Sequence, residues 1–211
     1  MEATEPIGTA DDAFAAETFE SVSGHLQAAG TALSCRAPFL LPGWMRAWQA
    51  VFAPDASLRL RSFRQAGEVV GIAALRVEGR TARFIGDAEV CDHLDLVCAA
   101  DLRREFCAAL LDRLKADEID RLELNPLRPD SVVLQGLIPA ARDRGFAVSV
   151  AAEEVLFEME LPGSWEGGAE VTCGTAGGYV TADVRIEVPV LFPGTLSVPF
   201  LTWCNAGLRR A

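Results

Sequence analysis

The sequence has very little of several residue types on which many functional sites depend. Lys115 is the only lysine among 211 residues, Tyr179 is the only tyrosine, and His25 and His93 are the only histidines. The cysteines form no C-x-x-C pair and have no histidine at metal-ligand spacing, so we expect no metal site. The six cysteines are Cys35, Cys91, Cys98, Cys107, Cys173 and Cys204.

Long hydrophobic runs and clusters of positive charge are also missing. No apolar stretch approaches the roughly 20 residues of a membrane span, and the acidic residues 1–6 do not resemble a signal peptide. The net charge of −11 argues against nucleic acid or an anionic membrane as a partner, because both require clustered Lys and Arg. Unpaired cysteines then make a reducing cytoplasm the simplest location.

Half of the residues are apolar, which is enough for one core or for one domain with an appendage. Asp11-Asp12 can cap a first helix that runs to about residue 29. Phe14, Phe19, Val22 and Leu26 would form its apolar stripe.

A second helix is predicted from Pro42, a residue that suits the first turn of a helix. Trp44, Trp48, Val51 and Phe52 fall at i, i+4, i+7 and i+8, on one face. Each indole buries roughly 150–250 Å², so we interpret the tryptophans as core anchors, with stacking on a bound substrate as the alternative. The residues expected in one core are Trp44, Trp48, Phe52, Phe84, Leu110, Leu122, Leu124 and Phe157.

The middle of the chain alternates between strand and helix signals. Residues 58–63, 69–77 and 81–85 predict an antiparallel meander with tight turns. The further expected elements are a short strand near 94–97, a helix over 101–116, a strand over 119–124, a helix over 131–144 kinked by Pro139, and strands over 146–150 and 155–161. This order predicts an α/β (α+β) fold with a mixed, partly antiparallel sheet covered by helices.

Glycine and proline recur after residue 166, and no helical period is visible there. We therefore divide the chain into an N-terminal helix (1–34), a central unit (35–162) and an atypical tail (163–211). The tail is expected to pack poorly and to add at most one edge hairpin, because its prolines remove ladder donors and its glycines lose much entropy on ordering.

The strongest polar cluster is the acidic loop over residues 87–95. Within it, a carboxylate from Asp92 or Asp95 could orient His93 as a general base for an attacking amine or hydroxyl. These three residues are the candidate catalytic group. The alternative is a solvated loop whose polar side chains bind backbone amides.

Several of these segments together resemble a known family. They are Phe39-Leu40-x-x-x-Trp44-x-x-x-Trp48, the meander, Phe84-Ile85-Gly86, Asp92-His93-Leu94-Asp95-Leu96, the strand 120–124, Gly145-Phe146, and Phe157-Glu158-Met159-Glu160-Leu161-Pro162-x-x-Trp165-Glu166. Over residues 35–166 the chain resembles the CelD-like branch of the GNAT acetyltransferases, which is similar to the FemAB-type aminoacyltransferases. The resemblance implies a GNAT-like half and an acyl-CoA-dependent N- or O-acyltransferase of cellulose or exopolysaccharide biosynthesis. Its donor would be acetyl-CoA or another acyl-CoA, and its acceptor a small molecule or glycan.

The chain departs from that family after Trp165-Glu166. There the family continues into a basic helix and a second half, in which strand–loop–helix amides are expected to hold the acyl-CoA pyrophosphate. Here the sequence runs into Gly167-Gly168, and the nearest cofactor signature, Arg64-Gln65-Ala66-Gly67-Glu68-Val69, lies in a hairpin. We therefore expect an N-terminal half with a possibly frameshifted end and weak or no acetyl-CoA binding. The alternative function is a non-catalytic GNAT-like half that binds a partner or glycan.

Overall fold

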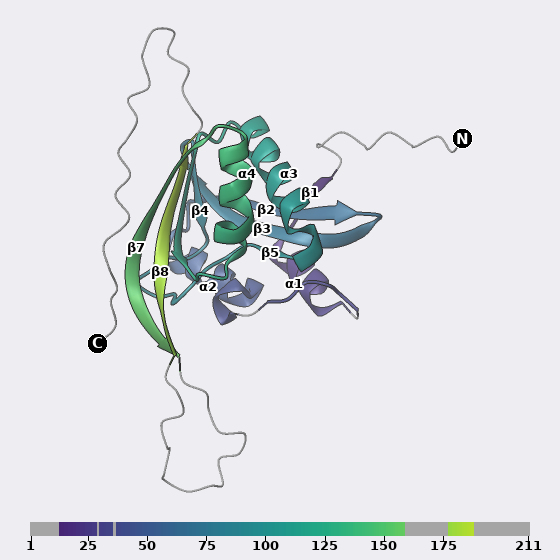
Figure 1. The fold of residues 1–211 in the computed structure, drawn as a ribbon. Helices are drawn as coiled ribbons and strands as arrows, with labels where there is room; N and C mark the ends of the chain where they lie inside the picture. Colours follow the sequence, from purple (N-terminus) through teal and green to yellow (C-terminus); the bar gives the residue numbers. More distant parts are fainter. Residues whose placement is uncertain (1–12, 29, 36, 159–176, 188–211) are drawn as a thin grey trace, which may run out of the picture.

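A mixed sheet of eight strands organises the molecule (Figure 1). The computed structural model describes residues 13–28, 30–35, 37–158 and 177–187. The strand order is β1-β2-β3-β4-β6-β8-β7, and β5 also pairs with β3. Only the β4–β6 pair is parallel among the described strands, which confirms the mixed, partly antiparallel sheet. The strands are β1 Phe14–Ala16, β2 Ser57–Gln65, β3 Glu68–Glu78, β4 Thr81–Phe84, β5 Val97–Cys98, β6 Arg121–Leu127, β7 Ala147–Glu158 and β8 Gly177–Glu187.

Helices cover both faces of this sheet. The α-helices are α1 Phe19–Gln27, α2 Pro42–Phe52, α3 Arg103–Ala116 and α4 Ile138–Asp143. Two 3-10 turns, η1 Pro38–Leu40 and η2 Ala100–Leu102, and a π-helical segment, η3 Val133–Leu137, complete them. Successive side chains of β3 alternate between the faces: Ala73 and Leu75 pack with α3 and α4, whereas Ile72 packs with α1. Figure 1 shows α3 and α4 side by side on one face.

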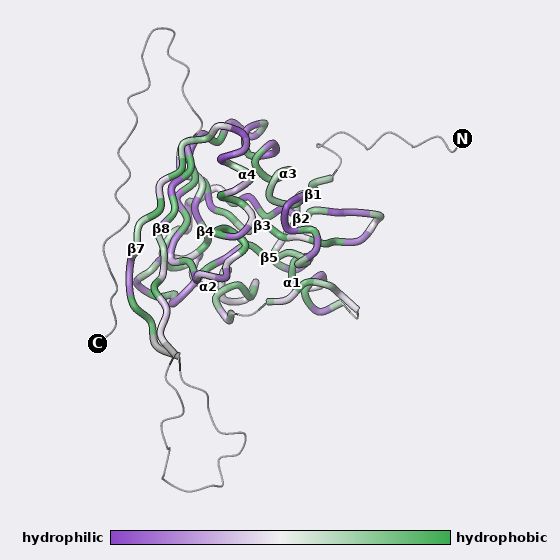
Figure 2. The backbone as a smooth tube through the Cα atoms, in the orientation of Figure 1, coloured by the Kyte–Doolittle hydropathy of each residue, from purple (hydrophilic) through white to green (hydrophobic). Residues whose placement is uncertain are grey.

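The predicted meander is confirmed. Strands β2, β3 and β4 pair antiparallel in sequence order. Ala66 and Gly67 both have positive φ, at 50° and 85°, which is the geometry of a two-residue hairpin turn that matches strand twist. Figure 2 shows hydrophobic stretches in β3, in the helices and in β7, and the side chains of β3 are buried on both faces of the sheet.

The predicted helix over residues 11–29 is wrong in its first part. Phe14 lies in β1, opposite Phe63 of β2, and the two rings are 5.2 Å apart. Helix α1 begins only at Phe19, because the Thr18 side chain accepts a hydrogen bond from the Ser21 N–H and Ser21 caps in return. Asp11-Asp12 lie outside the described residues.

The predicted buried face of α2 also needs correction. Met45 and Trp48 are buried, but Trp44 is 39% exposed, Val51 72% and Phe52 58%. The helix meets the body through a narrow stripe at i, i+3 spacing that contacts Leu60 and Ile85, so the remaining apolar residues face outward. Trp48 therefore anchors a cluster of its own and does not belong to one common core.

The other expected core residues follow the prediction. Phe84, Leu110, Leu122 and Leu124 are all buried in the cluster between the sheet and α3 and α4. The side chain of Phe157 lies outside the described residues.

The tail contradicts the expectation of few contacts with the body. Strand β8 lies between β6 and β7 and is hydrogen-bonded to both. Val184 is fully buried and Ile186 nearly so, and both belong to the main core cluster. At least residues 177–187 are thus an internal part of the sheet. Residues 163–176 and 188–211 lie outside the described residues.

Three smaller differences concern the elements before β8. The predicted helix over 131–144 is divided into η3 and α4, with Pro139 in the first turn of α4, where its missing N–H is tolerated. The two predicted strands over 146–161 are one strand, β7, with an irregularity between Ala152 and Val155. Strand β6 begins at Arg121 and continues through Asn125-Pro126 to Leu127, beyond the predicted end at residue 124.

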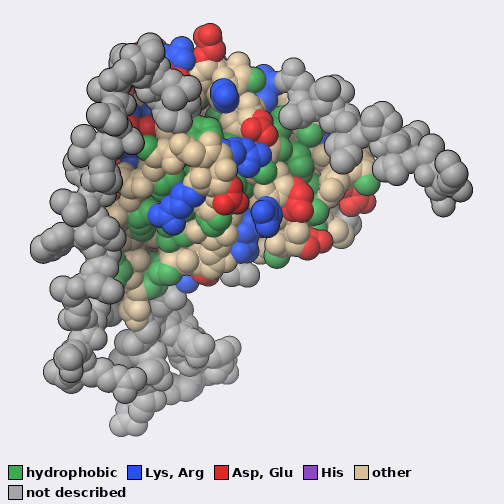
Figure 3. Space-filling model, turned by 45° about the horizontal axis from the view of Figure 1, so that its top comes forward, with side chains coloured by type: hydrophobic (Ala, Val, Ile, Leu, Met, Phe, Trp, Pro, Cys, Tyr) green, Lys and Arg blue, Asp and Glu red, His purple; other side chains and the backbone are tan. Residues whose placement is uncertain are grey.

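Charges of both signs are interspersed on the face shown in Figure 3. Many arginines are held in ion pairs, such as Arg61 with Asp117 at 3.1 Å and Arg144 with Asp112 at 3.2 Å. None of the helices in the described part of the chain is both long and apolar enough to cross a membrane.

Candidate functional site

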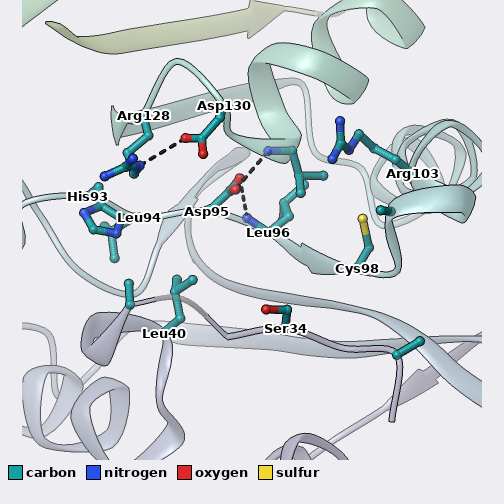
Figure 4. Close-up of a pocket in the computed structure, with 14 residues that line it drawn as sticks. Ser34, Leu40, His93, Leu94, Asp95, Leu96, Cys98, Arg103, Arg128 and Asp130 are labelled. Atoms are coloured by element: carbon teal, nitrogen blue, oxygen red, sulfur yellow. Dashed lines mark hydrogen bonds and ion pairs between the residues drawn. The ribbon is translucent and has the colours of Figure 1, made fainter. Parts of the chain in front are cut away.

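A pocket of about 390 Å³ lies between the α1–α2 connection and the segments that follow β4 and β6. Figure 4 shows Ser34 and Leu40 on one wall, the segment from His93 to Cys98 on the other, and Arg103 and His93 at opposite ends. The remaining lining residues are Ala32, Ala37, Ala100, Arg128, Asp130 and Val132. The pocket therefore collects side chains from three separate parts of the chain, residues 32–40, 93–103 and 128–132.

His93, one of the predicted catalytic residues, lines this pocket and is partly buried. Its ring meets the Phe39 ring edge-on at 6.1 Å, and Phe39 in turn meets Trp44 edge-on at 5.2 Å. The next residue, Leu94, donates its N–H to the carbonyl of Pro126 at 2.8 Å, which fixes the loop against β6. A row of three aromatic rings thus leads from the pocket to the exposed side of α2.

Asp95 also lines the pocket, but its carboxylate is hydrogen-bonded to backbone N–H groups. Its carboxylate accepts hydrogen bonds from the N–H groups of Val132, Val133 and Leu96, at 2.8, 3.3 and 2.8 Å. Burial raises the pKa of Asp95 to about 6, although these three N–H donors act in the opposite direction. The carboxylate thereby joins the His93 loop to the start of η3.

The other predicted site residues lie away from the pocket. Asp92 is exposed and does not line it. Trp48 is buried beside Met45, and the Arg76 guanidinium lies 5.3 Å from its ring centroid, so its surroundings are those of a core residue. Trp44 contacts the pocket indirectly, through Phe39.

The end of the pocket opposite His93 is a strand–turn–helix junction. Strand β5 continues through Ala99 and η2 into α3, and Cys98, Ala100 and Arg103 face the pocket. The sequence analysis missed this junction as a binding feature, because its residues, Cys98-Ala99-Ala100-Asp101-Leu102-Arg103, contain no glycine. The signal that could have found it was the order of predicted elements: a short strand followed at once by a helix.

Tyr179 of β8 contacts Arg128, one of the residues that line the pocket. The Arg128 guanidinium lies 4.4 Å from the Tyr179 ring centroid, a cation–π distance, and Arg128 also pairs with Asp130 at 3.0 Å. Tyr179 lies in the part of the chain that the sequence predicts to be an atypical tail, so no site was expected there. Its placement depends on β8 being an internal strand.

The thiol of Cys98 is not poised as a nucleophile. Burial raises its pKa to about 11, despite the opposing charge of Arg103, so the reactive thiolate is scarce at neutral pH. Within the described ranges, no group of three or more His, Cys, Asp or Glu side chains is arranged to hold a metal ion.

No protein-family model matches the sequence, and no curated protein matches it. Three solved structures show limited similarity. The ribosomal-protein-S18-alanine N-acetyltransferase from Escherichia coli has 11% identity and a TM-score of 0.44, over 87% of this chain and 98% of that one. The IAA acetyltransferase from Bacillus cereus has 12% identity and a TM-score of 0.42, over 83% and 98%. The diaminobutyrate acetyltransferase EctA from Paenibacillus lautus, in complex with L-2,4-diaminobutyric acid and coenzyme A, has 13% identity and a TM-score of 0.43, over 82% and 93%. Similarities of this size establish nothing about the activity of this chain.

Proposed function

We propose that the chain transfers an acyl group from acyl-CoA to an amine or hydroxyl of an acceptor bound in the pocket. The observation that carries this proposal is that His93 and the β5–α3 junction line opposite ends of one pocket. An acyl transfer requires both a base beside the acceptor and an anion-tolerant region for the phosphates of the donor. The resemblance over residues 35–166 implies the same reaction class.

The positive charge at the β5–α3 junction suits the anionic phosphates of acyl-CoA. The backbone of the junction suits them less well, because it contains no glycine. The first turn of a helix has N–H groups without intrahelical partners, and Arg103 adds a positive charge there. The lack of glycine between residues 98 and 103 restricts how closely the backbone can approach a phosphate. We therefore expect weak binding. When bound, the donor supplies an activated thioester carbonyl.

His93 is the residue of this chain that we assign to proton transfer. Its imidazole would take the proton from the acceptor amine or hydroxyl as that group forms a bond to the carbonyl carbon. The same proton can then pass to the leaving thiolate. The edge-on contact with Phe39 limits the rotation of the imidazole, and the fixed backbone at Leu94 keeps it at the pocket.

The acceptor in this proposal is a sugar or an amino sugar, in line with the exopolysaccharide link that the resemblance implies. Trp44 is 39% exposed and is one aromatic ring away from His93. A half-exposed indole offers a flat apolar surface with a polar edge, which suits a sugar ring. Tryptophan stacking would place the acceptor at the His93 end, away from the donor phosphates.

The second candidate function is non-catalytic binding of a partner or glycan. Large apolar side chains that are exposed on α2 and just before it favour this second candidate. Leu41 is 47% exposed, Val51 72% and Phe52 58%. Large apolar side chains exposed along one helix can mark an interaction site. This candidate needs neither His93 nor a cofactor.

Mass spectrometry of reaction mixtures separates the two candidates. The purified chain is incubated with acetyl-CoA and either glucosamine or a chito-oligosaccharide, and the acylated acceptor is quantified. The acyltransferase proposal expects product that depends on His93. Glycan binding by calorimetry without product would support the second candidate, and the absence of both product and acetyl-CoA binding would overturn the first.

A further inference from the structure

Strand β7 lies at one edge of the sheet, and among the described strands it pairs with β8 alone (Figure 1). It has 12 residues, whereas β1, at the opposite edge, has 3. A long edge strand presents a row of backbone N–H and C=O groups to which another strand can bind, and a very short one does not. The edge of this sheet that is long enough to bind another strand is therefore β7.

The first half of β7 lacks the features by which proteins usually protect an edge. Residues 147–152 read Ala-Val-Ser-Val-Ala-Ala and contain no charge and no proline. The irregularity in the pairing of β7 with β8, which bends a strand and blocks further pairing, comes only after Ala152, together with Glu153 and Glu154. The edge is thus open to a second strand over residues 147–152.

Exposed valines lie along the same edge. Val150 is 45% exposed, Val155 54% and Val180 of β8 43%. Val150 is opposite Val184, which is fully buried in the core, and Val155 is opposite Val180. Because residues two apart on a strand share a face, all three exposed valines lie on the face that packs with α3 and α4. A strand beside β7 would cover apolar surface there as well as backbone groups.

The charges at the two ends of β7 favour a second copy of the same strand in the antiparallel direction. Arg142 and Arg144 come just before β7, and Asp143 between them lies 3.9 Å from an arginine of α3. Glu153 and Glu154 lie in the second half of the strand and are exposed. A parallel copy would place all of these glutamates side by side, which is unfavourable. An antiparallel copy places each pair of glutamates beside the arginines at the start of the other strand.

The pattern of side chains also selects a register. With Ser149 opposite Ser149 of the second copy, Val148 lies opposite Val150 and Arg144 lies opposite Glu154. Opposed residues then share a face of the sheet, as the two-fold symmetry of an antiparallel pair requires. The uncharged residues meet at the centre and opposite charges meet at both ends.

We propose that two copies of this chain associate through β7, with the strands antiparallel and Ser149 on the two-fold axis. The partner is thus a second copy of the chain, and the two sheets become one continuous sheet. Stable interfaces bury about 1,600 Å², and a short strand pair with a few valines covers less, so we expect a weak dimer. This inference goes beyond the proposed function and does not depend on acyl transfer.

Sedimentation velocity of the full chain, from micromolar to millimolar concentrations, tests the association. We expect a concentration-dependent shift from monomer to dimer. Val150→Lys should weaken the dimer at least about tenfold, because two like charges would then lie near the centre of the interface. Val51→Lys is the matched control, since Val51 is 72% exposed on α2, and it should leave the dimer unchanged. An equal loss in both variants would overturn the assignment to β7.

Disulfide trapping tests the direction and the register. Ser149→Cys should give a covalent dimer on mild oxidation, above the background that the six native cysteines of wild type produce. Ala147→Cys should not, because the antiparallel register separates the two copies of residue 147 by roughly 13 Å, too far for a disulfide. Equal yields at both positions would indicate parallel strands and overturn the proposed arrangement.

Hydrogen exchange distinguishes a second copy from other occupants of the edge. We expect the backbone N–H groups of residues 147–152 to exchange more slowly as the protein concentration rises. Full protection in monomeric samples would show that the chain covers its own edge and would overturn the proposal, as would a chain that stays monomeric with rapid exchange. Circular dichroism verifies that Val150→Lys is folded. If it is not, the yields of Ser149→Cys and Ala147→Cys decide the question.

Discussion

The carboxylate of Asp95 accepts the backbone N–H of Val132 at 2.8 Å, which joins the His93 loop to the segment that precedes α4. Two further N–H groups, of Leu96 and Val133, point at the same carboxylate. Burial nevertheless dominates and raises the pKa of Asp95 to about 6, and the nearby charge of Asp130 adds to this effect. The folded protein therefore holds the Asp95 proton more tightly than the unfolded chain does.

This difference predicts how stability depends on pH. The contribution of Asp95 is fully present below about pH 4, the ordinary range of an aspartate, and is lost as the pH rises through about 6. Wild type should thus gain up to about 3 kcal/mol relative to Asp95→Asn between pH 7 and pH 4. Urea denaturation of both proteins at several pH values measures the difference, with Asp92→Asn as a control on the same loop. A difference that does not vary with pH would contradict the raised pKa.

The contrast between the two tryptophans of α2 predicts unequal losses of stability. Trp48 is buried among Met45, Leu60 and Ile85, so Trp48→Ala should destabilise the fold by roughly 3–5 kcal/mol. Trp44 is 39% exposed and has an edge-on contact with Phe39, so Trp44→Ala should lose about 1 kcal/mol. Chemical denaturation of the two variants checks this, and equal losses would refute the assignment of faces on α2.

The sequence was sufficient to predict those elements in which a single hydrophobic pattern is clear. In the meander, β2 and β4 alternate apolar and polar residues, β3 is an apolar run of strand length, and tight turns join them, so the pairing could be predicted. In α2, however, Trp44, Met45, Trp48, Val51 and Phe52 all lie on one broad side of the helix, and the period alone could not show which of them meet the sheet. Burial there depends on Leu60 and Ile85, which are distant in sequence.

Two other features depend on long-range partners and could not be predicted. The burial of β8 arises from its pairing with β6 and β7, while its surrounding composition resembles a loop. At the candidate site, the acidic loop indicated His93, but the partner of Asp95 is a backbone segment 37 residues away.

His93 is expected to decide turnover if the acyltransferase proposal is correct. His93→Ala should lower kcat by roughly 10²–10⁴, the range for loss of a general base, with a smaller change in the affinity for acetyl-CoA, which binds at the other end of the pocket. Glu89→Ala, an exposed carboxylate earlier in the same loop, is the control. Steady-state kinetics by mass spectrometry, together with thermal denaturation to verify folding, provides the measurement. Unchanged turnover in a folded His93→Ala protein would assign His93 to structure.

The final prediction concerns β8, the strand that connects the atypical tail to the sheet. Val184 is fully buried, opposite Leu124 of β6 and Val150 of β7, whereas Val180 on the same strand is 43% exposed. An unpaired carboxylate at position 184 would lie in the core, so Val184→Asp should prevent stable folding, and the milder Val184→Ala should lose about 2 kcal/mol. Val180→Asp is the matched control and should change stability by less than about 1 kcal/mol. Urea denaturation followed by circular dichroism gives these values, and a chain that ends at Glu158 should not fold. If that shortened chain unfolds cooperatively at the wild-type urea concentration, or if the two aspartate variants are equally stable, β8 is dispensable and the body is complete without the tail.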